Sequence, residues 1–201
     1  MLDVHLIPLE APGAILTSRL QALPNTLARV GRDTGFFAQS DPLEAGNTST
    51  LAWAWTPNQT PRAGGFQQRQ LNKYRGLAVH ASGQVTASEA LPTDSMGALI
   101  NASELQTKTA MLLVVAAGHL STGQRIAVAA SISPADRVWE GNPTEVGGRH
   151  QGRLRIQTDL ALYTTPDLAV LSTAVRAGGR SGDVAAELAA RLIQAVRESP
   201  N

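Results

Sequence analysis

The chain contains no cysteine. Disulfide bonds, thiolate nucleophiles, cysteine-ligated zinc and iron–sulfur clusters are therefore excluded. Aromatic residues make up only 4% of the 201 residues, whereas hydrophobic residues of all kinds make up 43%. We expect a folded protein whose core is built mainly from leucine, valine, isoleucine and alanine, since this hydrophobic share argues against disorder.

Charge is also scarce, because charged residues make up 16% of the chain and the formal net charge is only +1. A protein this close to neutral has no global field that attracts nucleic acid or an anionic membrane. The longest hydrophobic run, residues 110–118, is far shorter than the roughly 20 residues that a bilayer requires. The first residues lack the basic region of a secretory signal, so we expect a cytoplasmic protein without membrane association.

Hydrophobic periodicity predicts a strand and a helix at the start of the chain. Residues 1–7 alternate, with Leu2, Val4 and Leu6 on one face, as in a strand. Residues 17–33 carry hydrophobic side chains at three- and four-residue steps, which is typical of a helix. Pro24 interrupts that helix and predicts a kink or two shorter helices, with Asn25 or Thr26 capping the second.

The next segment contains a loop and a strand rich in tryptophan. Residues 35–47 show no regular pattern and are expected to form a loop. Residues 51–55 form the sequence LAWAW, which predicts a strand with Leu51, Trp53 and Trp55 on one face. We expect both tryptophans to fill the core beneath the sheet, because they are the largest hydrophobic side chains of the segment.

The remaining segments complete a fold of strands and helices. Residues 75–89 predict a β-hairpin whose two-residue turn is Ser82–Gly83, and residues 125–132 and 153–162 predict two further strands. Residues 57–74 and 133–150 are long polar loops. The whole chain, residues 1–201, is therefore expected to be a single α/β or α+β domain. Its mixed or antiparallel sheet of about five or six strands is flanked by helices near 16–32, 103–118, 166–176 and 182–198.

No motif for catalysis or metal binding is found. The four histidines, His5, His80, His119 and His150, are not spaced as a helical metal-binding pair, and no HExxH sequence occurs. We expect His5 and His80 to be hydrogen-bonded structural or surface residues of strands. A Gly-x-Ser-x-Gly nucleophile turn is also missing, so the sequence predicts no catalytic residue, metal site or cofactor.

Two local features remain as candidate binding sites. Arg149, His150, Arg153 and Arg155 form a basic cluster, and the last two share one face of a predicted strand, where they would contact phosphates. The alternative is an ordinary solvated strand face. Trp139, expected in the loop 133–150, is either a surface anchor for a partner or a side chain that packs the loop onto the body.

Three segments carry a resemblance to a known family. Residues 75–87 (RGLAVHASGQVTA), 91–97 (LPTDSMG) and 137–143 (RVWEGNP) are similar to the region that follows the AlbA-like domain in actinobacterial DNA-binding proteins of the Schlafen/AlbA type. The resemblance implies an accessory or regulatory domain beside a nucleic-acid-handling partner. The AlbA-like module itself is missing here, and no position matches an acidic nuclease motif, so direct DNA binding is not implied.

The leading functional hypothesis is a non-enzymatic binding or assembly domain that acts with a protein or nucleic-acid-handling partner. Self-association as a homodimer, through an apolar face of the sheet or through the last helix, is one form of it. The alternative is a small hydrolase or nucleotide-binding enzyme whose site lies in the loops 57–74 and 133–150.

Overall fold

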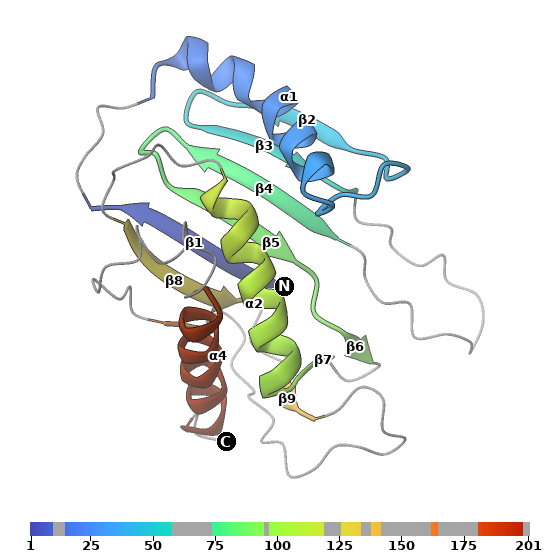
Figure 1. Cartoon of the computed structure of the whole chain (residues 1–201), viewed down its shortest axis with the longest axis vertical. Helices are drawn as coiled ribbons and strands as arrows, with labels where there is room; N and C mark the ends of the chain where they lie inside the picture. Colours follow the sequence, from blue (N-terminus) through green and yellow to red (C-terminus); the bar gives the residue numbers. More distant parts are fainter. Residues whose placement is uncertain are drawn as a thin grey trace.

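The computed structural model describes residues 1–9, 15–57, 74–94, 97–118, 126–133, 138–141, 162–164 and 181–198. Three helices and two sheets lie within these ranges (Figure 1). The elements are, in chain order, β1 (Leu2–Pro8), α1 (Thr17–Asp33), β2 (Glu44–Asn47), β3 (Leu51–Trp55), β4 (Arg75–His80), β5 (Val85–Glu89), β6 (Thr93–Asp94), β7 (Gly97–Ile100), α2 (Ala102–Ala117), β8 (Ile126–Ile132), β9 (Val138–Glu140), β10 (Leu162–Tyr163) and α4 (Ser181–Glu198).

The larger sheet has seven strands in the order β10-β8-β1-β5-β4-β3-β2. Every neighbouring pair in it is antiparallel. The smaller sheet has the order β6-β7-β9 and contains a parallel pair, β7 with β9. The predicted mixed α/β fold is therefore confirmed. The predicted helix 166–176 lies outside the described residues, as does the predicted strand 153–162 except for Leu162, which begins β10.

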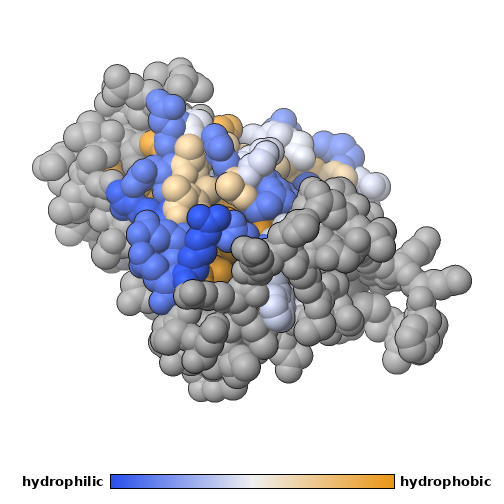
Figure 2. Space-filling model, turned by 90° about the horizontal axis from the view of Figure 1, so that it is seen from below, coloured by the Kyte–Doolittle hydropathy of each residue, from blue (hydrophilic) through white to orange (hydrophobic). Residues whose placement is uncertain are grey.

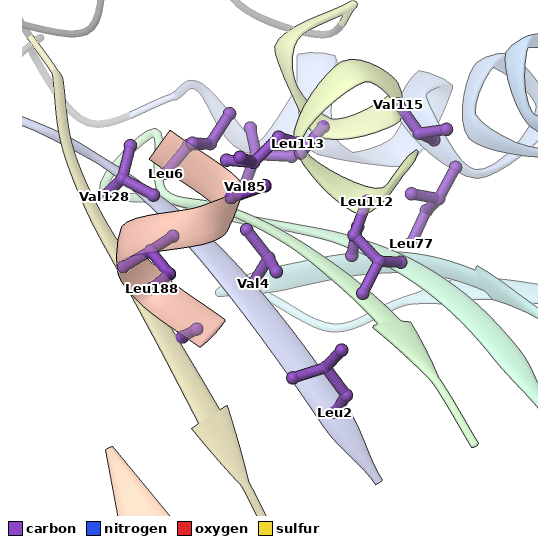
Figure 3. Close-up of a cluster of buried hydrophobic side chains, with 14 of the residues drawn as sticks. Leu2, Val4, Leu6, Leu77, Val85, Leu112, Leu113, Val115, Val128 and Leu188 are labelled. Atoms are coloured by element: carbon purple, nitrogen blue, oxygen red, sulfur yellow. The ribbon is translucent and has the colours of Figure 1, made fainter. Parts of the chain in front are cut away.

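All three described helices lie on the same side of the larger sheet, with α1 over β2 and β3 and with α2 over β1 and β5 (Figure 1). The alternation of each strand turns one set of hydrophobic side chains toward these helices. Figure 3 shows Val4 and Leu6 of β1 and Val85 of β5 directed toward Leu113 of α2 and Leu188 of α4. Burial of these side chains between the layers supplies the main stabilisation of the fold.

Helix α1 has the predicted bounds and is a single helix with Pro24 inside it, so the alternative of two shorter helices is wrong. Pro24 is buried, and the buried Leu20 and Leu27 lie on either side of it. Both leucines belong to the same core cluster, so the packing of α1 on β3 keeps the helix on the sheet on both sides of Pro24, despite the lost backbone hydrogen bond.

The C-terminal end of α1 is closed by a tight backbone turn. The Thr34 N–H donates to the Val30 carbonyl and the Phe37 N–H donates to the Gly31 carbonyl, both at 2.9 Å. Gly35 adopts a φ of 72°, which a residue with a side chain rarely adopts. This turn sends the fully buried Phe37 back beneath the helix.

One predicted loop and one predicted turn differ from the structure. The segment 35–47 is not entirely loop, since β2 occupies its last four residues and pairs with β3. The hairpin of β4 and β5 is confirmed, but the His80 N–H donates to the Gln84 carbonyl at 2.8 Å, so three residues rather than two form its turn. The last of the three, Gly83, has a φ of 84°, as three-residue hairpin loops require.

Helix α2 begins at a cap that the sequence reading missed. The side chain of Asn101 accepts a hydrogen bond from the Glu104 N–H at 2.8 Å and donates to the Glu104 carboxylate at 3.3 Å. This reciprocal arrangement satisfies one of the unpaired amides of the first turn. It fixes the start of α2 directly after β7.

Helix α4 confirms the predicted C-terminal helix, and its hydrophobic stripe belongs to the core. Leu188, Leu192 and Val196 are buried, and the helix packs on α2 and β8. The last helix therefore offers no free hydrophobic stripe for a homodimer.

Seen from below, hydrophilic residues flank a narrow hydrophobic band on the described surface (Figure 2). In the described part of the chain, no helix has both the length and the hydrophobicity to cross a membrane.

Candidate functional site

The tryptophans of β3 do not fill the core, so that prediction is wrong. Ala52 and Ala54 are fully buried and face α1, whereas Leu51, Trp53 and Trp55 alternate to the opposite side and are partly exposed. The physical reason is size, because two alanines allow α1 to approach β3 closely. We call the side of the larger sheet opposite α1, α2 and α4 the second face.

The two indole rings form a stacked aromatic pair on the second face. Their centroids are 5.1 Å apart and their planes differ by 13°, so Trp53 and Trp55 are stacked. The Trp55 indole N–H donates to the Glu44 carboxylate at 3.2 Å, which ties the pair to β2. A Cβ on Gly46 would lie 2.9 Å from Cζ2 of Trp53, so the Trp53 ring reaches across the edge strand.

Small residues of β4 lie beside the tryptophans on the second face. Gly76 of β4 is opposite Trp55, and Ala78 is opposite Trp53. Tyr74 lies over Gly76, because a Cβ on Gly76 would be 2.8 Å from the Tyr74 hydroxyl oxygen. Burial raises the pKa of the Tyr74 hydroxyl, and the negative charge of Asp3 raises it further.

Beyond β4, polar side chains of the second face form a hydrogen-bonded row across β5, β1 and β8. The Ser88 hydroxyl donates to the Asp3 carboxylate at 2.5 Å. The two ring nitrogens of His5 lie 3.1 Å from Thr86 Oγ1 and 3.0 Å from Ser131 Oγ. His5 is thus the hydrogen-bonded strand histidine that the sequence predicts, and it joins three strands.

The row does not have the geometry of a hydrolase triad. His5 contacts two hydroxyl groups, whereas the nearby carboxylate of Asp3 is bonded to Ser88 instead. A triad requires the acid to hold the histidine that activates the nucleophile. The arrangement therefore fits a structural network that satisfies buried polar groups between paired strands.

Burial lowers the pKa of the His5 imidazole below its ordinary value of 6.5, and the negative charge of Asp3 only partly opposes this. The unfolded chain therefore binds the proton first. The free energy of unfolding should decrease as the pH falls from 6.5 to the lowered folded pKa. We expect His5→Gln to abolish that loss.

Urea titrations of the wild type and His5→Gln at a series of pH values measure this dependence. His80→Gln is the matched control, because it removes an exposed imidazole that is hydrogen-bonded to the neighbouring Ser82. Equal pH dependence in the wild type and His5→Gln would show that His5 is not the responsible group.

The second face is partly exposed at His5, Thr86 and Ser131 as well as at the β2 end, where the tryptophans lie. At the other end, Ala127 and Ala129 of β8 are buried although they point to this face. Trp53, Trp55 and Leu51 are partly exposed, and Glu44 of the edge strand is exposed on the same face. The aromatic pair and the β2 edge are therefore accessible to an incoming molecule.

The structure tests only part of the predicted sites. Arg149, His150, Arg153 and Arg155 lie outside the described residues, as does most of the loops 57–74 and 133–150. Trp139 lies in β9 rather than in a loop, opposite Leu99 of β7, and it is partly exposed. Its role as a partner contact stays a prediction.

Close to Trp139, an ion pair connects β9 with the last helix. Two guanidinium nitrogens of Arg197 contact the Glu140 carboxylate, one of them at 2.7 Å. Hydrogen bonding from Arg197 lowers the pKa of the Glu140 carboxyl. The contact positions the end of α4 beside the smaller sheet.

Within the described ranges, no three histidine, aspartate or glutamate side chains are grouped so that they could hold a metal ion. Comparisons with family models, with curated proteins and with solved structures found no match to this chain. The inference of function therefore rests on the geometry of the partly exposed tryptophan pair.

Proposed function

We propose that this protein is a non-enzymatic binding or assembly domain of the cytoplasm, and that its binding surface comprises Trp53, Trp55 and the β2 edge. The stacked tryptophan pair on the second face is the observation that carries the proposal. Tryptophan is the residue type most enriched among side chains that dominate binding energy at protein interfaces. Two of the three tryptophans in the chain lie at this one place.

The surroundings of the pair favour a protein partner. The Glu44 carboxylate accepts a hydrogen bond from the Trp55 indole, which favours one orientation of the ring and so lowers the entropy cost of association. The edge strand beside it presents backbone groups that an extended segment can pair with. The resemblance of residues 75–87, 91–97 and 137–143 to the Schlafen/AlbA-type region favours a partner among nucleic-acid-handling proteins.

Co-purification from the native host tests this function. We expect an affinity-tagged wild-type chain to retain a partner, either another protein or an untagged copy of itself. Trp53→Ala and Trp55→Ala should each reduce that retention at least tenfold, the effect of a loss of about 1.4 kcal/mol.

Val114→Ala is the control, because it removes an exposed hydrophobic side chain of α2, on the helix side of the sheet, and should leave the retention of that partner unchanged. Circular dichroism must show that each variant is folded. Equal retention by the wild type, Trp53→Ala and Trp55→Ala, or retention of nothing by any of them, would contradict the proposal.

A further inference from the structure

The β2 edge has a backbone geometry that a second strand can extend. The Thr48 N–H donates to the Leu51 carbonyl at 2.7 Å, so Thr48 points its backbone groups at β3. In an antiparallel pair the direction alternates from residue to residue. Gly46 and Glu44 therefore also point inward, whereas Ala45 and Asn47 point their N–H and C=O groups away from the sheet.

These outward groups lie at an exposed edge. β2 is the last strand of the larger sheet on its side, and Ala45 and Asn47 are both exposed. Among the described residues, no group accepts a hydrogen bond from either outward amide. Proteins protect such an edge with very short strands, with charged side chains, above all lysine, or with proline. β2 (EAGN) is short and has one glutamate, but it contains neither lysine nor proline.

We propose that β2 pairs with β2 of a second copy of this chain, antiparallel about a two-fold axis through Gly46. This inference rests on the proposed function, since it names the partner of the same surface. In this register Ala45 of one copy is opposite Asn47 of the other, and the outward groups of the two residues form hydrogen bonds on both sides of the axis. The two larger sheets become one continuous sheet.

The side chains are self-complementary in this register. Glu44 of each copy is opposite Thr48 of the other, so no two carboxylates face each other, as they would if Glu44 were opposite Glu44. Gly46 adds no side chain at the axis. The ring of Trp53 already reaches over Gly46, and the two β3 strands would be only three strand spacings of about 4.8 Å apart, so the two Trp53 rings approach each other over the axis.

The size of this contact predicts a weak dimer. A strand of four residues buries little surface, and stable interfaces bury more than about 1,000 Å² in total. The paired tryptophans must therefore supply much of the buried hydrophobic area. We expect a reversible equilibrium in which the dimer appears as the concentration rises.

Sedimentation velocity of the full chain over a wide concentration series tests the pairing. The mass should rise from 21.1 kDa toward twice that value. Ala45→Pro should hold the chain as a monomer, because it deletes an outward amide but no hydrogen bond to β3. Ala45→Ser retains the amide and should dimerise like the wild type, whereas Trp53→Ala should shift the equilibrium at least tenfold toward monomer.

Hydrogen exchange gives a second readout that needs no substitution. The amides of Ala45 and Asn47 should exchange freely in dilute solution and become protected at high concentration. A wild-type chain that stays monomeric, a dimer that Ala45→Pro leaves intact, or the same exchange at both concentrations would overturn the inference. If the chain is monomeric but retains another protein, and if Trp53→Ala abolishes that retention, the self-pairing is wrong and the proposed function still holds.

Discussion

Replacing Glu89 by glutamine is expected to lower the free energy of unfolding by about 3 kcal/mol. Glu89 is a buried residue of β5, on the side of the sheet that faces the helices. Arg75 Nη2 lies 3.0 Å from its Oε1, and Lys108 Nζ of α2 lies 3.2 Å from its Oε2. One carboxylate therefore neutralises two cations, from β4 and from α2.

The arginine of this trio also connects the sheet to the turn after α1. Arg75 Nη1 donates to the Phe36 carbonyl at 2.7 Å, and its guanidinium lies 5.5 Å from the centre of the Phe36 ring. The Lys108 contact with Glu89 is ionic, without hydrogen-bond geometry. Glutamine would keep the size of the side chain but leave two cations uncompensated, which is the costly way to break a buried pair.

Urea unfolding of Glu89→Gln measures the loss. The expected value is at the low end of the range for buried pairs, because the Arg75 and Lys108 side chains are 32% and 20% exposed. Glu187→Gln is the matched control, since it makes the same change in an exposed pair with Arg191 and should cost less than about 1 kcal/mol. Equal losses in the two variants would show that the trio does not hold α2 to the sheet.

Replacing Gly31 by alanine is expected to destabilise the protein by about 3 kcal/mol, although alanine favours helices. A Cβ on Gly31 would lie 2.2 Å from Cδ2 of Phe37, whose ring is fully buried beneath α1. The ring cannot move outward without opening the core, so the steric cost exceeds the gain of about 1 kcal/mol in helix propensity.

Gly182→Ala in the first turn of α4 is the control, because, apart from its chain neighbours and the helix backbone, no atom of the described residues lies within 4 Å of the added Cβ. It should leave stability unchanged or raise it by up to about 1 kcal/mol. Adding Phe37→Leu to Gly31→Ala should cost less than the sum of the two single changes, since the smaller side chain relieves the clash. Thermal or urea unfolding decides between these outcomes, and a stabilised Gly31→Ala would contradict the packing.

The periodic elements could be predicted from the sequence. β1, α1, the β4–β5 hairpin, α2, β8 and α4 follow from hydrophobic spacing, because each buries one face against a neighbouring layer. β2 could not, since Glu-Ala-Gly-Asn has no strand pattern. That strand forms because the turn between Thr48 and Leu51 brings it beside β3.

The orientation of β3 shows a different limit. Alternation correctly places Trp53 and Trp55 on one face, but it does not say which face meets the helices. Residue size favoured the core for the tryptophans, whereas α1 packs on Ala52 and Ala54 instead. A strand whose alternate positions are all alanine is a signal of close helix packing that could have reversed the prediction.

The polar row of the second face depends on strand register, which the sequence does not reveal. Asp3 and Ser88 are 85 positions apart, and His5 and Ser131 are 126 apart. Each serine and threonine in the row resembles many others in the chain. Only the pairing of β1 with both β5 and β8 brings these side chains together.

The position of the tryptophans is the claim on which the proposed binding surface depends, and acrylamide quenching tests it most directly. A variant with Trp139→Phe retains fluorescence from Trp53 and Trp55 only. We predict emission at long wavelength and efficient quenching in the native protein, as partly exposed indoles give. Short-wavelength emission that acrylamide quenches only after unfolding would place both rings in the core and contradict the account.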